Sequence, residues 1–223
     1  MIEEIDVLES KEKSALSKVC YQFTKRSFDI VCSLLGCLVL LPIALVVKVM
    51  YMISGDFNSI FYTQKRIGKD GKEFKFYKFR TMVPNADKVL EEMFKKDKKL
   101  EKEYKIKMKL DKDPRITKAG RILRKSSIDE LPQMINILIG DMSLVGNRPY
   151  LPREKKDMGE YFDDIVKTKP ALTGLWQVSG RSNTTFKKRL KLEKYYSNNC
   201  NLKLDIKIIF NTVRVVVLRK GAK

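Results

Sequence analysis

The chain has 223 residues, 43% of them apolar, which is enough for one sizeable domain with its own core. Lysine and arginine number 46 against 27 acidic residues, so the formal net charge of +19 favours anionic partners: nucleic acid, an anionic membrane surface or phosphorylated small molecules. The chain has no histidine, which excludes a Ser-His-Asp triad, a Cys-His pair and any zinc site that needs imidazole. Its cysteines show no Cys-x-x-Cys spacing and are expected to be free thiols in a reducing compartment.

The amino-terminal part of the chain changes character near residue 25. Residues 1–24 carry charges of both signs and lack the hydrophobic core of a signal peptide, so we expect a polar helix or tail. Residues 30–47 contain no charged side chain. As a straight helix this run would be about 27 Å long, slightly short of the roughly 30 Å hydrocarbon core of a bilayer. Pro42 lies in its second half and is expected to kink or break the helix.

Basic residues flank this apolar run on both sides, so the positive-inside rule offers no asymmetry that would place one end outside. If the amino-terminal tail crossed the membrane, Lys25 and Arg26 would lie on the outer face, against the positive-inside rule. We therefore predict that residues 25–53 dip into the membrane and return, with the break at Pro42. A membrane-spanning anchor is the first alternative, and a buried helix of a soluble core is the second.

The segment 55–80 alternates short apolar runs with turn signals. Asp70-Gly71 between two such runs predicts a β-hairpin. Residues 74–80 interleave aromatic and cationic side chains, which favours a half-buried strand beside a phosphate site over a stacking platform for nucleic acid. Residues 85–110 have apolar side chains at helical spacing and are predicted to form one long amphipathic helix.

Two adjacent carboxylates, Asp129 and Glu130, stand where another helix is expected to begin, with Pro132 in its first turn. The positive end of that helix dipole would favour ionised carboxylates and attract anionic ligands. Positive charge just upstream, which includes Arg115 and Arg124, would bind a diphosphate and keep Asp129 ionised. The alternative is an ordinary capping box of Ser127 and Glu130, and spacing alone favours it.

Three features complete the carboxyl-terminal half. Residues 140–149 and 172–181 are glycine-bracketed loops that each present one arginine, Arg148 and Arg181, and they suggest substrate-binding loops. Residues 204–218 are apolar and rich in β-branched side chains. They fit either a strand or a helix that lies on a membrane.

Taken in order, these segments resemble the bacterial sugar transferases that act on polyprenyl phosphate, the monotopic phosphoglycosyl transferases of surface-polysaccharide and glycoconjugate assembly. The resemblance runs from about Lys25 to the carboxyl terminus. Besides the basic pair and the proline-containing apolar run, it rests on residues 62–68 (YTQKRIG), 77–82 (YKFRTM), 113–117 (DPRIT), 123–133 (LRKSSIDELPQ), 140–146 (GDMSLVG) and 173–181 (TGLWQVSGR).

The resemblance implies a mixed, helix-rich α/β fold. Its small cytosolic catalytic domain would be residues 54–223, with a re-entrant membrane helix at 25–53, interfacial amphipathic helices and a polar tail at 1–24. The protein would lie at the cytoplasmic face of the inner membrane. The implied reaction transfers a sugar-1-phosphate from a UDP-sugar to polyprenyl (undecaprenyl) phosphate.

In that reaction Asp129 would attack the β-phosphorus, expel UMP and carry the phosphosugar until polyprenyl phosphate takes it. A carboxylate is already ionised at neutral pH, so such a nucleophile needs no histidine base. Glu130 would hold Mg²⁺, a hard cation served by oxygen ligands. The resemblance thus favours catalysis over capping for this pair.

The remaining roles come from positions that match the family motifs. Lys78, Arg124 and Arg181 would surround the phosphates, and Arg148 and Pro149 would meet the uridine. Lys25 and Arg26 would mark the depth at which the polyprenyl phosphate head is met, and anchoring alone is the alternative for them. Further candidates near the site are Asp205, Arg80 and Arg115.

Three positions depart from the family pattern: Asn147 replaces a proline, Ala171 a glycine and Glu193 an aspartate. The expected partners are a UDP-sugar, undecaprenyl phosphate, anionic inner-membrane lipid and downstream glycosyltransferases, with no nucleic acid. Two other functions stay open at this point, a membrane-tethered basic nucleic-acid-binding module and an inactive scaffold. The chain also lacks the multi-span amino-terminal extension of some family members and is expected to be the minimal catalytic form.

Overall fold

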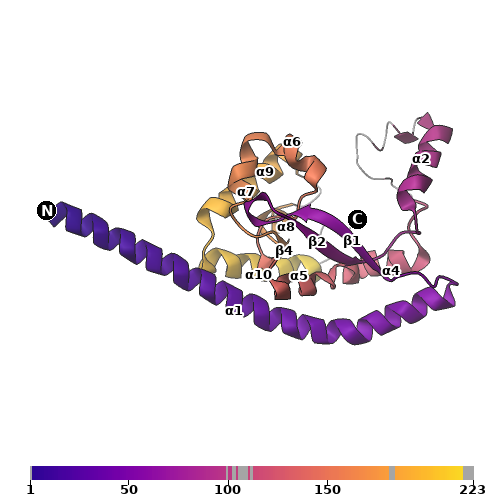
Figure 1. The fold of residues 1–223 in the computed structure, drawn as a ribbon, viewed down its shortest axis with the longest axis horizontal. Helices are drawn as coiled ribbons and strands as arrows, with labels where there is room; N and C mark the ends of the chain where they lie inside the picture. Colours follow the sequence, from indigo (N-terminus) through magenta and orange to yellow (C-terminus); the bar gives the residue numbers. More distant parts are fainter. Residues whose placement is uncertain are drawn as a thin grey trace. The chain divides into compact units, whose positions relative to one another are not determined.

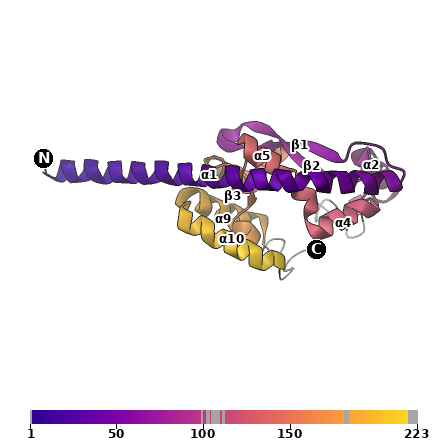
Figure 2. The same cartoon turned by 90° about the horizontal axis from the view of Figure 1, so that it is seen from below.

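The computed structural model describes residues 2–98, 100, 101, 104, 110, 113–180 and 184–217, with side chains between residues 16 and 215 of these ranges. These residues form the predicted mixed, helix-rich fold with small two-stranded sheets (Figures 1 and 2). The helices are α1 (Ile2–Ile53), α2 (Ala86–Lys96), α4 (Lys118–Ser126), α5 (Gln133–Ile139), α6 (Lys155–Met158), α7 (Phe162–Ile165), α8 (Leu175–Val178), α9 (Phe186–Asn199) and α10 (Leu202–Val217). The strands are β1 (Phe61–Ile67), β2 (Glu73–Phe79), β3 (Ser143–Val145) and β4 (Ala171–Thr173), and the short 3₁₀ turns are η1 (Lys69–Gly71), η2 (Ile128–Glu130), η3 (Pro152–Glu154) and η4 (Gly159–Tyr161).

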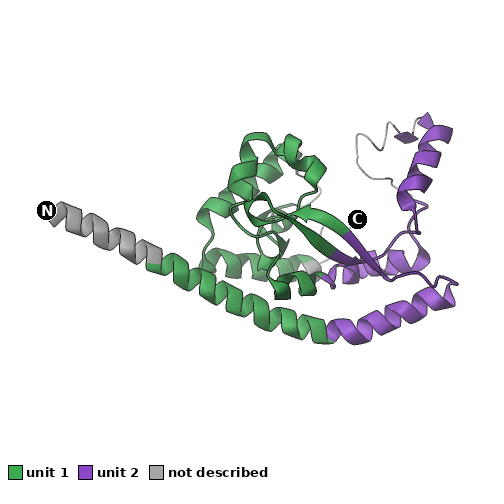
Figure 3. Cartoon of the chain, in the orientation of Figure 1, with its two compact units in different colours: residues 1–38, 64–76, 133–223 green, residues 39–63, 77–132 purple. Residues whose placement is uncertain are grey.

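The chain divides into two compact units, each assembled from separate stretches (Figure 3). Unit 1 comprises Met1–Leu38, Gln64–Phe76 and Gln133–Lys223, and unit 2 comprises Val39–Thr63 and Tyr77–Pro132. The division falls inside α1 and inside the β1–β2 hairpin. The functional segments predicted at 1–24, 25–53 and 54–223 follow the chain instead, and they stay predictions.

Helix α1 contains both the polar amino-terminal residues and the apolar run (Figure 1). It continues through Pro42 to Ile53, so the helix break predicted at Pro42 is not present in the structure. A proline removes one N–H donor and blocks the carbonyl four residues earlier, here that of Leu38, while the turns on either side keep their hydrogen bonds. Leu16–Ile53 is long and apolar enough to cross a membrane, and the re-entrant path stays a prediction.

The hairpin predicted around Asp70-Gly71 is confirmed. Strands β1 and β2 form one sheet, and η1 connects them. Asp70 and Gly71 have φ angles of 56° and 74°, in the left-handed region that glycine adopts without steric cost. The hairpin brings the aromatic and cationic residues of β2 beside β1.

The single long helix predicted over residues 85–110 is wrong. Helix α2 ends at Lys96, because Asp97 adopts an extended conformation with φ −135° and ψ 100°. The Asp97 side chain then accepts a hydrogen bond from the backbone N–H of Leu100 at 3.1 Å, which is how a residue begins a new helical turn. For the carboxyl-terminal segment, where strand and helix were both open, the structure has the helix α10.

The core of unit 1 surrounds the parallel pair β3–β4, in which Ser143 lies opposite Ala171 and Val145 opposite Thr173. Among the described residues, buried side chains form clusters on the surrounding elements: Phe76, Ile137 and Met142; Ile67, Tyr150, Met158, Ile165 and Leu190; and Val145, Tyr196 and Ile208. Burial of this much apolar surface is the main source of the unit's stability.

Unit 2 packs α4 directly on the backbone that follows β2. A Cβ atom added to Gly120 would lie 2.0 Å from the carbonyl oxygen of Thr81, so no side chain fits there. Thr117 begins the same helix by accepting a hydrogen bond from Gly120 N–H at 2.9 Å. The rings of Phe61 and Phe79 stack with centroids 5.4 Å apart on the hairpin.

Gly120→Ala should therefore force α4 away from Thr81 and lower the free energy of unfolding by at least about 2 kcal/mol. Thermal unfolding in detergent measures this as a drop in Tm. The matched control is Gly55→Ala, where φ is +74° and nothing lies within 4 Å of the added Cβ. The control should cost about 1 kcal/mol of backbone strain. An equal Tm for the two variants would contradict the packing argument.

Candidate active site

Asp129 and Glu130 lie in the 3₁₀ turn η2, directly after α4. Ser127 ends α4 in the left-handed conformation, with φ 57°, and its N–H binds the carbonyl of Arg124 at 3.2 Å. The Ser127 side chain makes no capping hydrogen bond, so the capping box does not form. Helix α5 begins only at Gln133, and Pro132 precedes it instead of lying in its first turn. The pair therefore sits in a tight turn between two helices.

Lys78 of β2 holds this turn. Its ammonium nitrogen lies 2.8 Å from Oε1 of Glu130 and 3.8 Å from Oδ2 of Asp129. The Asp129 side chain is 14% exposed, that of Lys78 26% and that of Glu130 42%. The less exposed carboxylate is thus the one proposed as nucleophile, and the more exposed one is the candidate metal ligand.

Arg124 approaches the same turn from α4. Its Nε donates a hydrogen bond to the hydroxyl oxygen of Thr81 at 2.9 Å, and its positive charge lowers the pKa of Asp129. Thr81 and Gly120, which fix this arginine, were not singled out from the sequence. A glycine inside an amphipathic helix was the available signal. We call Lys78, Arg124, Asp129 and Glu130 the carboxylate cluster; all four belong to unit 2.

The Asp129 carboxyl has a pKa above its usual value. Burial is the largest cause, because it disfavours the charged form. Lys78 opposes the shift and Glu130, a like charge, adds to it. Lys78 and Arg124 favour the ionised form, the direction expected for the upstream arginine, but they do not outweigh desolvation in setting the pKa of Asp129.

Arg80 and Arg115, the further phosphate candidates, are held by carboxylates of unit 2. Arg80 pairs with Asp56 at 2.9 Å and lies over the ring of Tyr51, whose hydroxyl donates to the Arg80 carbonyl. Arg115 pairs with Asp113 at 2.7 Å, and both side chains are almost completely buried. These contacts give both arginines a structural role, and a role toward phosphate stays a prediction.

Lys25 and Arg26 of α1 bind protein acceptors in unit 1. The Lys25 ammonium lies 2.5 Å from Oδ2 of Asp205, 2.8 Å from the Val145 carbonyl oxygen and 3.2 Å from the Tyr196 hydroxyl. The Arg26 guanidinium donates to the carbonyls of Ile137 and Leu138 at 2.6 and 2.8 Å. These are carbonyls at the end of α5, where a cation is favourable.

Those contacts give the basic pair a structural role inside unit 1, and anchoring at the membrane, the alternative for this pair, stays a prediction. An ammonium has three N–H donors, and three acceptors surround that of Lys25. Asp205, proposed as an acidic residue near the site, is the buried partner that fixes Lys25. Contact of Lys25 or Arg26 with polyprenyl phosphate stays a prediction.

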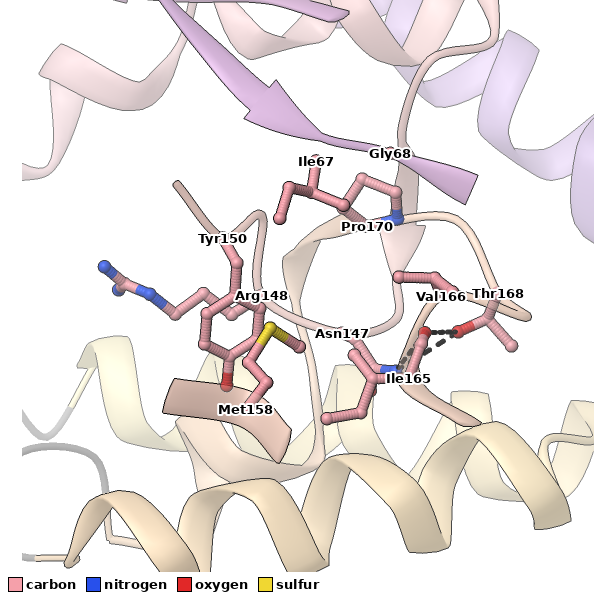
Figure 4. Close-up of a pocket in the computed structure, with 10 residues that line it drawn as sticks. All are labelled: Ile67, Gly68, Asn147, Arg148, Tyr150, Met158, Ile165, Val166, Thr168 and Pro170. Carbon is pink, nitrogen blue, oxygen red and sulfur yellow. Dashed lines mark hydrogen bonds between the residues drawn. The ribbon is translucent and has the colours of Figure 1, made fainter. Parts of the chain in front are cut away.

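The proposed uridine contacts, Arg148 and Pro149, both belong to unit 1, and Arg148 is one of the residues that line a small hollow of ≈ 230 Å³, a volume that includes the solvent at its mouth. Figure 4 shows the Arg148 side chain extending away from this hollow, whose wall includes Tyr150, Met158 and Ile165. The guanidinium lies over the ring of Trp176, 5.7 Å from its centroid. Arg181, the third proposed phosphate ligand, lies outside the described residues.

The carboxylate cluster fits Mg²⁺ only in company with other oxygen ligands. Asp129 and Glu130 supply the hard oxygen donors that the ion prefers. Among the described residues, no three or more Asp, Glu, His or Cys side chains are grouped as a metal site. Phosphate and water oxygens would therefore complete the coordination, as is common for this ion. The metal itself stays a prediction.

The apolar helix α1 suggests membrane association, and the carboxylate pair bound by Lys78, with Arg124 near enough to lower the pKa of Asp129, suits a site for phosphate chemistry. The family model for bacterial sugar transferases matches residues 20–219. The chain belongs to this family.

Several curated relatives are similar over most of the chain. The undecaprenyl-phosphate galactose phosphotransferase of Salmonella typhimurium is 41% identical over 217 residues, 97% of this chain and 45% of that protein. The exopolysaccharide production protein ExoY of Sinorhizobium fredii is 41% identical over 199 residues, 89% of this chain and 88% of that protein. The chain thus spans less than half the length of the first relative and most of the second.

Asp129→Asn should leave the protein as stable as the wild type or more so. The folded-state pKa of Asp129 is raised, so this carboxyl favours folding when protonated, and its contribution falls as pH rises from the unfolded value through the folded one. At neutral pH the buried charge is a penalty that asparagine removes. Equal or higher Tm at pH 7 is the expected result, and a clear loss of Tm would contradict the assigned direction.

Proposed function

We propose that this protein transfers a sugar-1-phosphate from a UDP-sugar to polyprenyl phosphate, with release of UMP. The observation that carries the proposal is the carboxylate cluster: a mostly buried Asp129 beside the cations of Lys78 and Arg124. The Salmonella relative is named for undecaprenyl phosphate and galactose, which supports a lipid phosphate as acceptor.

In the first step an oxygen of Asp129 attacks the β-phosphorus of the UDP-sugar. A bond forms between that oxygen and phosphorus, and the bond from phosphorus to the oxygen bridging the two phosphates breaks. UMP leaves with the bridging oxygen and the electron pair. Lys78 and Arg124 stabilise the negative charge on the phosphate oxygens, and burial keeps water from competing.

In the second step an oxygen of polyprenyl phosphate attacks the same phosphorus. The acyl phosphate bond to Asp129 breaks, the carboxylate is restored and polyprenyl-diphospho-sugar is released. The attacking phosphate is already an anion, so neither step requires a histidine. This agrees with a chain that has none.

Glu130 and the substrate phosphates would hold Mg²⁺, which would neutralise charge on the diphosphate. Glu130 is the more exposed member of the pair and is shared with Lys78, so a metal would compete with that ammonium for Oε1. When Glu130 binds the metal, the Lys78 ammonium would be released from that carboxylate and could bind a phosphate oxygen of the substrate.

The acceptor lipid keeps its tail in the bilayer, so its phosphate must be met at the membrane surface. We propose that α1 enters the inner membrane and that the rest of the chain lies on the cytoplasmic face. The net charge of +19 would add attraction to anionic lipid, about 1 kcal/mol for each cation near the surface. The long apolar stretch Leu16–Ile53 supports this placement.

The central test is UMP release from a panel of UDP-sugars by the detergent-solubilised protein with Mg²⁺ and undecaprenyl phosphate. Lipid-dependent release should occur with one or few sugars and fall at least about 10³-fold in Asp129→Asn. Thermal unfolding provides the control that the variant is folded. Release that persists in Asp129→Asn would contradict the nucleophile assignment, and no release with any sugar would favour the inactive scaffold.

Lys78→Met should move the acidic limb of kcat/KM to higher pH. The Lys78 cation lowers the pKa of Asp129, so its removal raises that pKa further, and the carboxyl then stays protonated and unreactive up to a higher pH. The pH dependence of UMP release measures the shift. Lys72→Met, at an exposed turn position, should keep the wild-type profile. An unmoved limb in Lys78→Met would contradict the assigned coupling.

A further inference from the structure

The loop that carries Arg148 is held from α9. We call residues 146–150 the Arg148 loop. Glu193 and Ser197 are four residues apart on α9, so they occupy the same face of the helix. Both contact the loop: Glu193 accepts from the Arg148 backbone N–H at 3.3 Å, and Ser197 Oγ lies 2.6 Å from Nδ2 of Asn147. One face of α9 therefore fixes the backbone conformation of the Arg148 loop.

Asn147 anchors the loop through its side chain. Besides Ser197, its Nδ2 reaches the Ile165 carbonyl oxygen at 3.1 Å and the Thr168 hydroxyl at 3.2 Å, and the residue is only 2% exposed. A proline here, as the family pattern leads us to expect, could make none of these side-chain contacts. The Asn147 carbonyl also accepts from Ala171 N–H at 2.7 Å, which continues the β3–β4 pairing.

Glu193 is a buried carboxylate, only 1% exposed. Burial raises its pKa to about 7, while Tyr150, Arg148 and Arg189 favour its ionised form. A buried charge costs free energy unless it is paired or hydrogen-bonded, and the hydrogen bond from the Arg148 N–H together with the nearby arginines offsets part of that cost. Its Oε1 accepts the hydrogen bond from the Arg148 backbone N–H. Glutamate has one methylene more than the aspartate that the family pattern leads us to expect, so its carboxylate reaches further from α9.

The side chain of Arg148 is directed by the same surroundings. Its guanidinium lies over Trp176 of α8, and Arg189 of α9 lies over the same ring at 4.9 Å. The backbone of Arg148 is held by Glu193, and the preceding residue is held by Ser197. The Arg148 guanidinium therefore extends from a backbone that is held in place before any ligand binds. Such preorganisation lowers the entropy cost of binding.

We propose that Asn147 and Glu193 are positioning residues that fix the Arg148 loop for nucleotide binding. Both residues depart from the family pattern, and both lie where the loop contacts α9. Asn147 donates a hydrogen bond to Ser197, and Glu193 accepts one from the Arg148 N–H. The proposal rests on the proposed function, because it needs a UDP-sugar as substrate, and on the expectation from the family resemblance that Arg148 meets the uridine. Neither residue is proposed to touch the reacting atoms.

The test compares Asn147→Ala and Glu193→Ala with two matched controls at exposed positions, Asn199→Ala on the same helix and Glu160→Gln. Glu193→Gln is the conservative variant, because it keeps an acceptor oxygen for the Arg148 N–H. Three quantities are measured on the full chain: the Kd for UMP, KM and kcat for the UDP-sugar, and hydrogen exchange at the Arg148 amide. Thermal unfolding shows which variants are folded.

In both alanine variants the Kd for UMP and the KM should rise about tenfold while kcat changes less than about threefold. Exchange at the Arg148 amide should accelerate in Glu193→Ala. Glu193→Gln and both controls should stay within about threefold of the wild type. If the alanine variants only lower Tm, with Kd and the KM-to-kcat pattern unchanged, the residues are purely structural and the proposal is overturned.

Failure of the proposed function gives a different pattern. A wild-type protein that binds no UMP and turns over no sugar would refute the proposed reaction. Amide exchange would still test the loop, because it depends on no ligand. Unchanged exchange in Glu193→Ala would overturn the positioning role by itself.

Discussion

The ion pairing of Lys78 with two adjacent carboxylates is the interaction on which the candidate site depends. Asp129 and Glu130 carry like charges on neighbouring residues, and burial already raises the pKa of Asp129. Without a cation at this distance, the nucleophile would hold its proton more tightly. Lys78 also joins β2 to the turn η2, so the same contact that favours the ionised carboxylate fixes where it lies.

The rest of unit 2 keeps that contact in place. Gly120 allows α4 to touch the Thr81 carbonyl, and one turn later Arg124 reaches the Thr81 hydroxyl. Arg80 and Arg115 have carboxylate partners of their own, whereas Arg124 rests on a neutral hydroxyl. Some of the dense positive charge in the sequence therefore stabilises the unit through ion pairs, and Lys78 and Arg124 are the cations proposed to bind phosphate.

Unit 1 uses buried polar contacts to attach the amino-terminal part of α1. Lys25 binds Asp205, Arg26 caps the end of α5, and Asp29 accepts hydrogen bonds from Ser143 Oγ and Leu144 N–H at 3.1 and 2.9 Å. Removing one partner of a buried ion pair leaves an uncompensated charge, so these contacts specify one seating of the helix. The apolar face of α1 that remains exposed is the part suited to lipid.

The sequence by itself determined the mixed fold, the Asp70-Gly71 hairpin and the apolar helix, because each depends on local conformation or on motifs in fixed order. It favoured a catalytic role for Asp129 and Glu130 only through the family resemblance, and that role stays a prediction. The sequence could not distinguish a charged residue that stabilises the fold from one that belongs to the candidate site. Lys25 and Lys78 are both lysines beside aromatic or apolar runs, yet tertiary contacts place one against Asp205 and the other between the carboxylates. Two further features were decided only by the tertiary structure. The extended conformation of Asp97 ends α2, although the apolar spacing of the sequence continues beyond it. Helix α1 continues through Pro42, because the loss of one N–H donor there does not outweigh the hydrogen bonds of the neighbouring turns.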